Sequence, residues 1–180
     1  MRLKDTLARS ILAGICIGIA ATAYLSVDDA LIGSLLFSIG LLAVVIGKLE
    51  LCTGKVGYVR LTGVKDLVVV WIGNLAGVVF TVILLIHTRL EDKLISNAVK
   101  AYQIKSTDST ISLFILAIFC GILMFIAVDG YKATKNPVIV ILPVMAFILC
   151  GFEHSIADMY YYIVGMACNP ADIPKGIAQI

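Results

Sequence analysis

The sequence predicts an all-α integral membrane protein. Hydrophobic residues make up 61% of the chain and charged residues 14%, and the mean hydropathy is +1.04. A soluble domain is usually about half apolar and roughly a quarter charged. The apolar residues form long unbroken runs rather than an alternating pattern, which favours membrane helices over a β-barrel.

Three apolar segments each fit one membrane-spanning helix. They cover about residues 10–25, 67–87 and 111–128, and roughly 20 residues are needed to cross a bilayer as a helix. We therefore expect a plain span at each of these places.

A further apolar segment, residues 137–167, is too long for one plain span. It contains Pro143, Gly151 and three ionisable residues, which are Glu153, His154 and Asp158. A discontinuous helix fits this pattern, with a first half ending near Leu149, an irregular stretch and then a second half.

The apolar segment 30–46 is interrupted in the same way. It is followed by the Gly-rich stretch 47–57, which contains Glu50 and Thr53. This stretch is a candidate re-entrant loop. The first half of the chain is therefore predicted to contain a helix, a broken helix and a helix.

The matching interruptions predict an internal repeat within a single transmembrane domain, 1–180, with a functional site where the two repeats meet. The first repeat covers about 1–88 and the second about 109–180. Residues 169–180 are too few to span a membrane. We therefore expect the chain to be truncated before the third helix of the second repeat.

The basic residues predict the orientation in the membrane. With a cytoplasmic N-terminus, nine of the 14 Lys and Arg residues lie inside, and four of the other five lie in the expected outer loop 88–109. Positive charge is enriched in cytoplasmic loops. We therefore expect a multi-pass protein of the plasma (inner) membrane with its N-terminus inside.

Ionisable groups within a membrane are functional candidates by default. His154 is the strongest, since an imidazole titrates near neutrality and can exchange a proton with a passing solute. The alternative is that it only ties down the broken helix by hydrogen bonds. Glu153 is expected to be structural and to accept N–H groups that the break leaves free. Asp158 either caps the second half-helix or faces a vestibule.

Thr53 is the corresponding candidate in the first break, next to Glu50. Its hydroxyl can both donate and accept a hydrogen bond beside unpaired loop backbone. If the two repeats face each other across the membrane, Thr53 and His154 converge near the midplane.

Other classes of protein fit poorly. The five cysteines form no CxxC pair and are interpreted as buried thiols rather than disulfides or metal ligands. Cys150 and His154 have no third group to orient them as a nucleophilic pair. A net charge of +2 does not suggest nucleic acid. We expect no enzyme activity, no metal and no cofactor.

Three stretches resemble motifs of the formate/nitrite transporter family. The sequence LPVMAFILCGFEHSIADM, residues 142–159, is similar to the signature of that family's fifth helix. ELCTG, residues 50–54, resembles the loop in its second helix, and WIGNLAGVVF, residues 71–80, the GN motif of its third. The resemblance covers essentially the whole chain. It implies an aquaporin-like homopentamer with one pore per protomer that transports formate, nitrite, hydrosulfide or short carboxylates.

The resemblance also assigns pore residues by position. The matched positions are His154, Thr53, Phe37, Phe147, Leu41, Leu51 and Asn74. It implies that His154 is the central pore histidine and Thr53 the loop threonine. Phe37 and Phe147 match the outer aromatic constriction, with Leu41 nearby, and Leu51 falls at the inner constriction. Asn74 matches the asparagine of the GN pair.

The chain departs from the family pattern at several places. Asp158 replaces the signature asparagine, and Phe125 stands where an asparagine is usual in the fourth helix. A lysine often found before that helix is replaced at Ser109, with Lys105 nearby. The sixth helix and its second GN motif are absent. The expected function is a channel or transporter for small weak-acid anions, with a proton involved at His154. The alternative is a non-conducting truncated or regulatory membrane subunit.

Overall fold

The structure of the protein, a computed structural model, describes residues 3–58 and 63–168. Every regular element in these residues is a helix, which confirms the predicted all-helical class. The α-helices are α1 (Leu3–Leu25), α2 (Ala30–Ile46), α3 (Cys52–Lys55), α4 (Val64–Leu85), α5 (Glu91–Thr107), α6 (Thr110–Thr134), α7 (Val138–Cys150) and α8 (Ser155–Cys168). A 3-10 turn, η1 (Val56–Tyr58), follows α3.

The predicted membrane spans are present. Helices α1, α4 and α6 are long and apolar enough to cross a membrane. Helices α7 and α8 are long and apolar enough only together, and the bend of 44° at the short break between them fits a broken span. Helix α1 starts earlier than expected because the polar lead-in is also helical, with Asp5 in its first turn, where a negative charge is favourable. The chain is thus a multi-pass membrane protein.

The prediction of a loop at 88–109 is wrong, since most of these residues form helix α5. This segment is too polar to show an apolar run. It is held by packing instead, with Leu94, Ala98 and Tyr102 buried on one face, and α5 lies against α8. Its acidic first turn and the basic Lys105 near its end match the polarity of a helix dipole.

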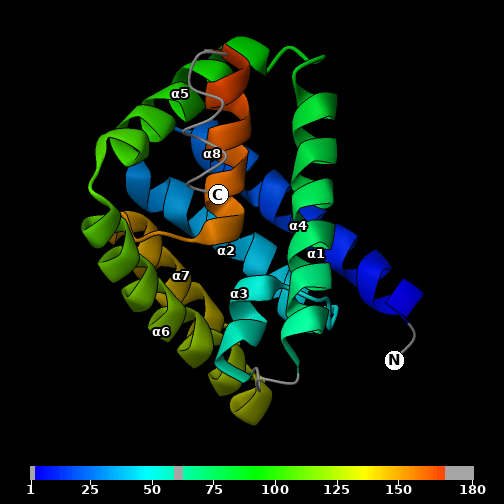
Figure 1. The fold of residues 1–180 in the computed structure, drawn as a ribbon. Coiled ribbons are helices and arrows are strands. Elements are labelled where there is room, and N and C mark those ends of the chain that lie inside the picture. The colour runs from blue at the N-terminus through cyan, green and yellow to red at the C-terminus, as the bar shows by residue number, and fades with distance from the viewer. Residues whose placement is uncertain (1–2, 59–62, 169–180) are drawn as a thin grey trace.

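Helices α1 and α4 cross at very short range on one side of the molecule (Figure 1). A Cβ atom on Gly14 would overlap the backbone oxygen of Asn74, and one on Gly77 would overlap that of Ile11. Small residues allow such close packing of membrane helices. The crossing fixes Asn74 directly behind the first break.

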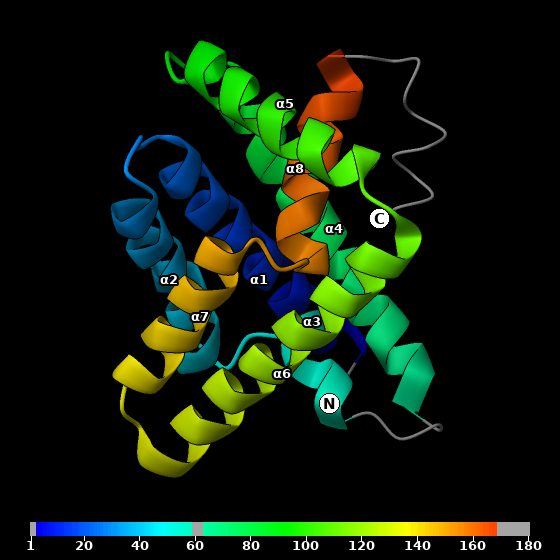
Figure 2. The ribbon, with the colours of Figure 1, turned by 90° about the vertical axis from the view of Figure 1, so that its left-hand side faces the viewer.

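The second half repeats the pairing of the first. Helix α7 packs beside α6 as α2 packs beside α1, and α2 and α7 meet between the two pairs (Figure 2). Both breaks therefore open toward the same central region. The repeat boundaries stay a prediction, and residues 169–180, where we expected the truncation, lie outside the described residues.

The expectation of buried thiols is only partly correct. Cys52 and Cys120 are buried and Cys16 is half-buried, whereas Cys150 and Cys168 are exposed; all five are free. An apolar run in a membrane protein also covers surface that faces lipid, so apolar neighbours in the sequence do not imply burial.

Candidate functional site

The first break follows the end of α2. Residues 47–51 are irregular, and the rest of the predicted loop is helical in α3 and η1. The N–H of Leu49 still reaches back to the carbonyl of Val44 at 2.9 Å, after which the chain extends into α3. Thr53 lies in the first turn of α3 and is half-buried.

Asn74 of α4 holds this break in place. Its side-chain oxygen accepts the backbone N–H of Cys52 at 2.9 Å. Its amide nitrogen donates to the carbonyls of Ser10 and Glu50, both at 2.8 Å. The side chain is fully buried and all these partners are backbone groups, so the structure places Asn74 behind the loop, as a support.

The second break separates α7 from α8. Gly151 ends α7 in the left-handed conformation, with φ of 69°, as glycine often does at a helix C-terminus. His154 precedes the first residue of α8 and caps that helix. Its Nδ1 accepts the N–H of Ala157 at 3.2 Å, and its carbonyl accepts that of Asp158 at 2.9 Å. The Nδ1 nitrogen of the ring therefore fixes the broken helix by a hydrogen bond, which is the alternative role considered for His154 above.

The other ring nitrogen faces Thr53. Its Nε2 lies 3.0 Å from Thr53 Oγ1, across the two halves of the chain, so the predicted convergence of these two residues is confirmed. Because an N–H group points at Nδ1, that nitrogen is unprotonated, and a neutral ring then carries its hydrogen on Nε2. Nε2–H donates to Thr53 Oγ1, which leaves the hydroxyl hydrogen of Thr53 available for another acceptor.

Apolar side chains lie next to this pair. The ring of Phe147 stacks on the imidazole of His154, with centroids 5.2 Å apart and 19° between the planes. Phe37 meets Phe147 edge-on at 5.6 Å. Leu41 and Leu51 are also buried and border one common cavity, and Leu41 lies one turn along α2 from Phe37.

A buried charge cluster lies behind His154. The ammonium of Lys105 is 2.8 Å from Glu153 Oε1 and 2.9 Å from Asp158 Oδ1, and each of the three side chains is at most 13% exposed. Burial alone would lower the pKa of Lys105, which lies outside the membrane spans, but the charges of Asp158 and Glu153 hold that pKa above its usual range. The lysine therefore stays charged at neutral pH.

This cluster corrects two expectations. Glu153 accepts a lysine ammonium, whereas the expected partners were the backbone N–H groups freed by the break; its structural role stays a prediction. Lys105 was of interest in the sequence only because it lies near Ser109, where the family often has a lysine. In the structure it makes the ion pairs with Glu153 and Asp158. The sequence contained one signal of such a cluster, since two carboxylates close together in an apolar segment require a cation.

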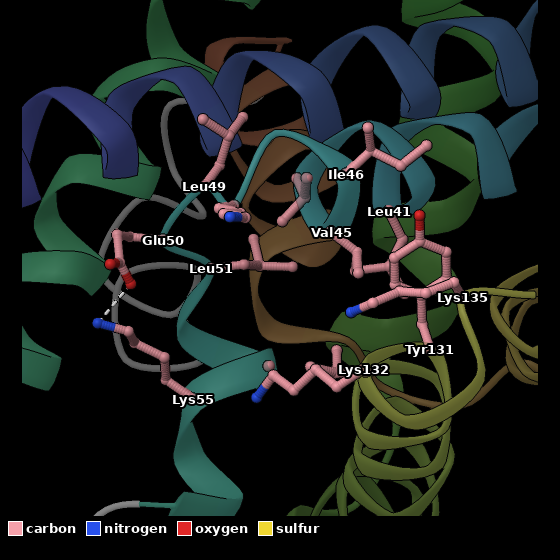
Figure 3. A pocket seen from close by; sticks show the side chains of 14 residues that line it. Leu41, Val45, Ile46, Leu49, Glu50, Leu51, Lys55, Tyr131, Lys132 and Lys135 are labelled. Atoms are coloured by element: carbon pink, nitrogen blue, oxygen red, sulfur yellow. Dashed lines mark ion pairs between the residues drawn. The ribbon is translucent and has the colours of Figure 1, made fainter. Parts of the chain in front are cut away.

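Cavities lie on different sides of the Thr53–His154 pair. One of about 170 Å³ is bordered by Phe147, His154 and Asp158, which supports the vestibule alternative for Asp158 over the capping one. Another of about 180 Å³ is bordered by Thr53. A larger one of about 470 Å³ lies beyond Leu51, with Glu50 and Lys55 paired at its edge (Figure 3).

Comparison with known proteins shows to which family a chain with this arrangement belongs. A family model described as Formate/nitrite transporter matches residues 1–179. The formate channel FocA of Haemophilus influenzae is 27% identical over 197 residues, covering 93% of this chain and 69% of that protein. FocA of Escherichia coli K12 is also 27% identical, over 92% of this chain and 68% of that protein.

Solved structures agree. A pentameric formate channel with formate bound superposes with a TM-score of 0.83 at 28% identity, over 98% of this chain and 80% of that one. An FNT family ion channel at 23% identity, covering 97% of this chain and 82% of that one, shares the fold with a TM-score of 0.80. The fold and the paired breaks thus define a membrane channel class. The chain belongs to the formate/nitrite transporter family.

Proposed function

We propose that the protein is a homopentameric channel or transporter for small monovalent anions of weak acids, such as formate, nitrite, hydrosulfide or short carboxylates. The observation that carries this proposal is the Thr53–His154 hydrogen bond where the two helix breaks meet. The similarity to a pentameric formate channel with formate bound supports both the ligand class and the assembly.

The pore residues create a specific physical problem. An anion must pass the apolar side chains of Phe37 and Phe147 on one side and Leu51 on the other. Moving a bare unit charge into such a constriction costs several kcal/mol even after relaxation. Protonation of the anion removes most of this cost, so we propose that the neutral acid, or the anion together with a proton, passes down its gradient.

Thr53 and His154 hold the anion between these constrictions. In this mechanism the hydroxyl hydrogen of Thr53 donates to the anion, and the Nε2–H of His154 polarises that hydroxyl. Hydrogen bonds to charged groups are stronger than neutral ones. His154 thus acts as a hydrogen-bond donor, while its other nitrogen keeps the ring fixed on α8.

The test is flux into proteoliposomes, with formate, nitrite and hydrosulfide compared side by side. His154→Phe keeps an aromatic ring but removes both nitrogens, and we expect it to abolish pH-dependent formate flux without loss of the pentamer. His87→Phe, at an exposed position in the turn after α4, is the matched control and keeps wild-type flux. Equal flux in His154→Phe and wild type across acid and neutral pH contradicts the proposal.

The same experiment decides the alternative of a non-conducting subunit. Wild-type protein that forms a pentamer but passes none of the three anions would support that alternative.

A further inference from the structure

A cavity lies between the end of α2, the first break and the end of α6 (Figure 3). Its volume is about 470 Å³, within the range of roughly 300–1,000 Å³ that is typical of small-molecule sites. Four lysines border it, which are Lys48, Lys55, Lys132 and Lys135, and Leu51, two residues before Thr53, also lines it. We call it the lysine vestibule.

The positive charge of the lysine vestibule is largely uncompensated. Glu50, the carboxylate that borders it, is paired with Lys55. Within residues 3–58 and 63–168, Lys48, Lys132 and Lys135 have no ion-pair partner. Among the described residues, their charges therefore border the cavity without a direct ion pair.

Aromatic rings orient two of these lysines. Lys132 Nζ lies 4.0 Å from the ring centroid of Tyr58, and Lys135 Nζ lies 5.6 Å from that of Tyr131. A cation–π contact holds an ammonium in place without cancelling its charge. The nearby carboxylate of Asp129 accepts the Tyr58 hydroxyl at 2.7 Å.

The backbone carries an independent sign of function. Lys48 and Lys135 have φ of 51° and 59°, and within the described part of the chain they are the non-glycine residues with positive φ. Glycine is the usual residue for this conformation at a helix end, and a side chain with a Cβ is disfavoured there. Both exceptions are lysines on one cavity, which fits a requirement for their charge.

We propose that the lysine vestibule binds a multivalent phosphate anion, which stops at Leu51 and blocks transport from this side of the membrane. Several separate ammonium groups suit a ligand with several charged oxygens. A multivalent anion cannot be neutralised by a single proton, so it cannot follow a weak acid through the apolar constriction. The block rests on the proposed function, whereas the binding does not.

Binding is tested with pyrophosphate and the purified full chain by titration calorimetry. We expect the double variant Lys132→Gln/Lys135→Gln to bind roughly tenfold more weakly, since two exposed charge contacts with the anion are lost. Lys65→Gln, an exposed lysine of α4 on the same predicted side, is the matched control and binds as wild type. Absence of pyrophosphate binding, or equal affinity in the double variant and the control, overturns the proposal.

The block is tested by formate flux in right-side-out and inside-out vesicles. Pyrophosphate should inhibit from the side that holds Lys132, predicted to be cytoplasmic, and the double variant should resist this inhibition. Inhibition from both sides alike, or none despite binding, overturns the block. Absence of formate flux without pyrophosphate contradicts the proposed function instead and leaves the calorimetric result standing.

The phosphate group can belong to a soluble anion or to a lipid headgroup. Nanodiscs of phosphatidylcholine with and without phosphatidic acid distinguish these sources. Unchanged pyrophosphate affinity assigns the vestibule to a soluble anion, and weakened affinity assigns it to the lipid phosphate; both outcomes support phosphate recognition.

Discussion

The two helix breaks occupy corresponding places in the two halves but are held by different chemistry. In the first, the neutral amide of Asn74 bonds three backbone groups of α1 and the break. In the second, a charged cluster of Lys105, Glu153 and Asp158 lies behind the backbone turn. Asn74 therefore only shapes the first break, whereas the charged cluster at the second break also sets the charge beside His154.

The difference has a physical basis. An amide carries no net charge, so the bonds that Asn74 makes to the first break do not depend on pH. An ammonium with two carboxylates is sensitive to which of the three groups is charged, and desolvated charges interact strongly. The first break therefore positions Thr53, while the second positions His154 and determines its electrostatic surroundings.

Loss of the cation should have the largest effect. Lys105→Met leaves two buried carboxylates without a partner, and breaking a buried ion pair typically costs about 3–5 kcal/mol. We expect a large fall in thermal stability in detergent, and a smaller fall in acid, where protonation removes the unpaired charges. The triple variant Lys105→Met/Glu153→Gln/Asp158→Asn should recover most of the stability, and an equally unstable triple variant would show that charge is not the cause.

Removal of the amide should be somewhat less severe. Asn74→Leu keeps a similar shape but removes three hydrogen bonds, and a typical hydrogen bond contributes about 0.5–1.5 kcal/mol to stability. We expect a loss of about 3 kcal/mol with no dependence on pH, again read from thermal unfolding. Asn97→Leu, which removes one bond to the Leu25 carbonyl and a long, exposed one of 3.4 Å from Lys100, is the control and should lose less.

The Thr53 hydroxyl should affect transport more than stability. A hydrogen bond to a charged group is worth about 1.5–3 kcal/mol, so Thr53→Val should weaken the interaction with formate roughly tenfold or more. Thr53→Ser should retain most activity because it keeps the hydroxyl. Formate uptake against concentration, at matched protein in the membrane, measures both. Equal uptake in the Val and Ser variants would mean that the hydroxyl does not meet the substrate.

Asp158→Asn should have the smallest effect on stability. Lys105 keeps its ion pair with Glu153, and the amide oxygen can still accept from the ammonium, so we expect a change of less than about 1 kcal/mol. The variant also restores the residue that the family pattern has at this place. A loss as large as that of Lys105→Met would show that Asp158, and not Glu153, is the essential partner of the lysine.

The amino-acid sequence by itself determined the membrane class, the spans and both breaks. Unbroken apolar runs have few alternatives to membrane helices, and the ends of α2 and α7 lie at or next to the predicted residues. The pairing of Thr53 with His154 was also predictable, because matching interruptions in two repeats imply a shared site. These features depend on local composition and on the repeat.

Only the tertiary structure decided the partners of the polar groups. Helix α5 is too polar to be seen as a hydrophobic run, and it brings Lys105 to Glu153 from 48 residues away. The three bonds of Asn74 and the lysine vestibule likewise join distant segments. An ion pair or a cavity depends on the distances between elements after packing, and no sequence pattern contains those distances. The same packing fixes which nitrogen of His154 faces Thr53.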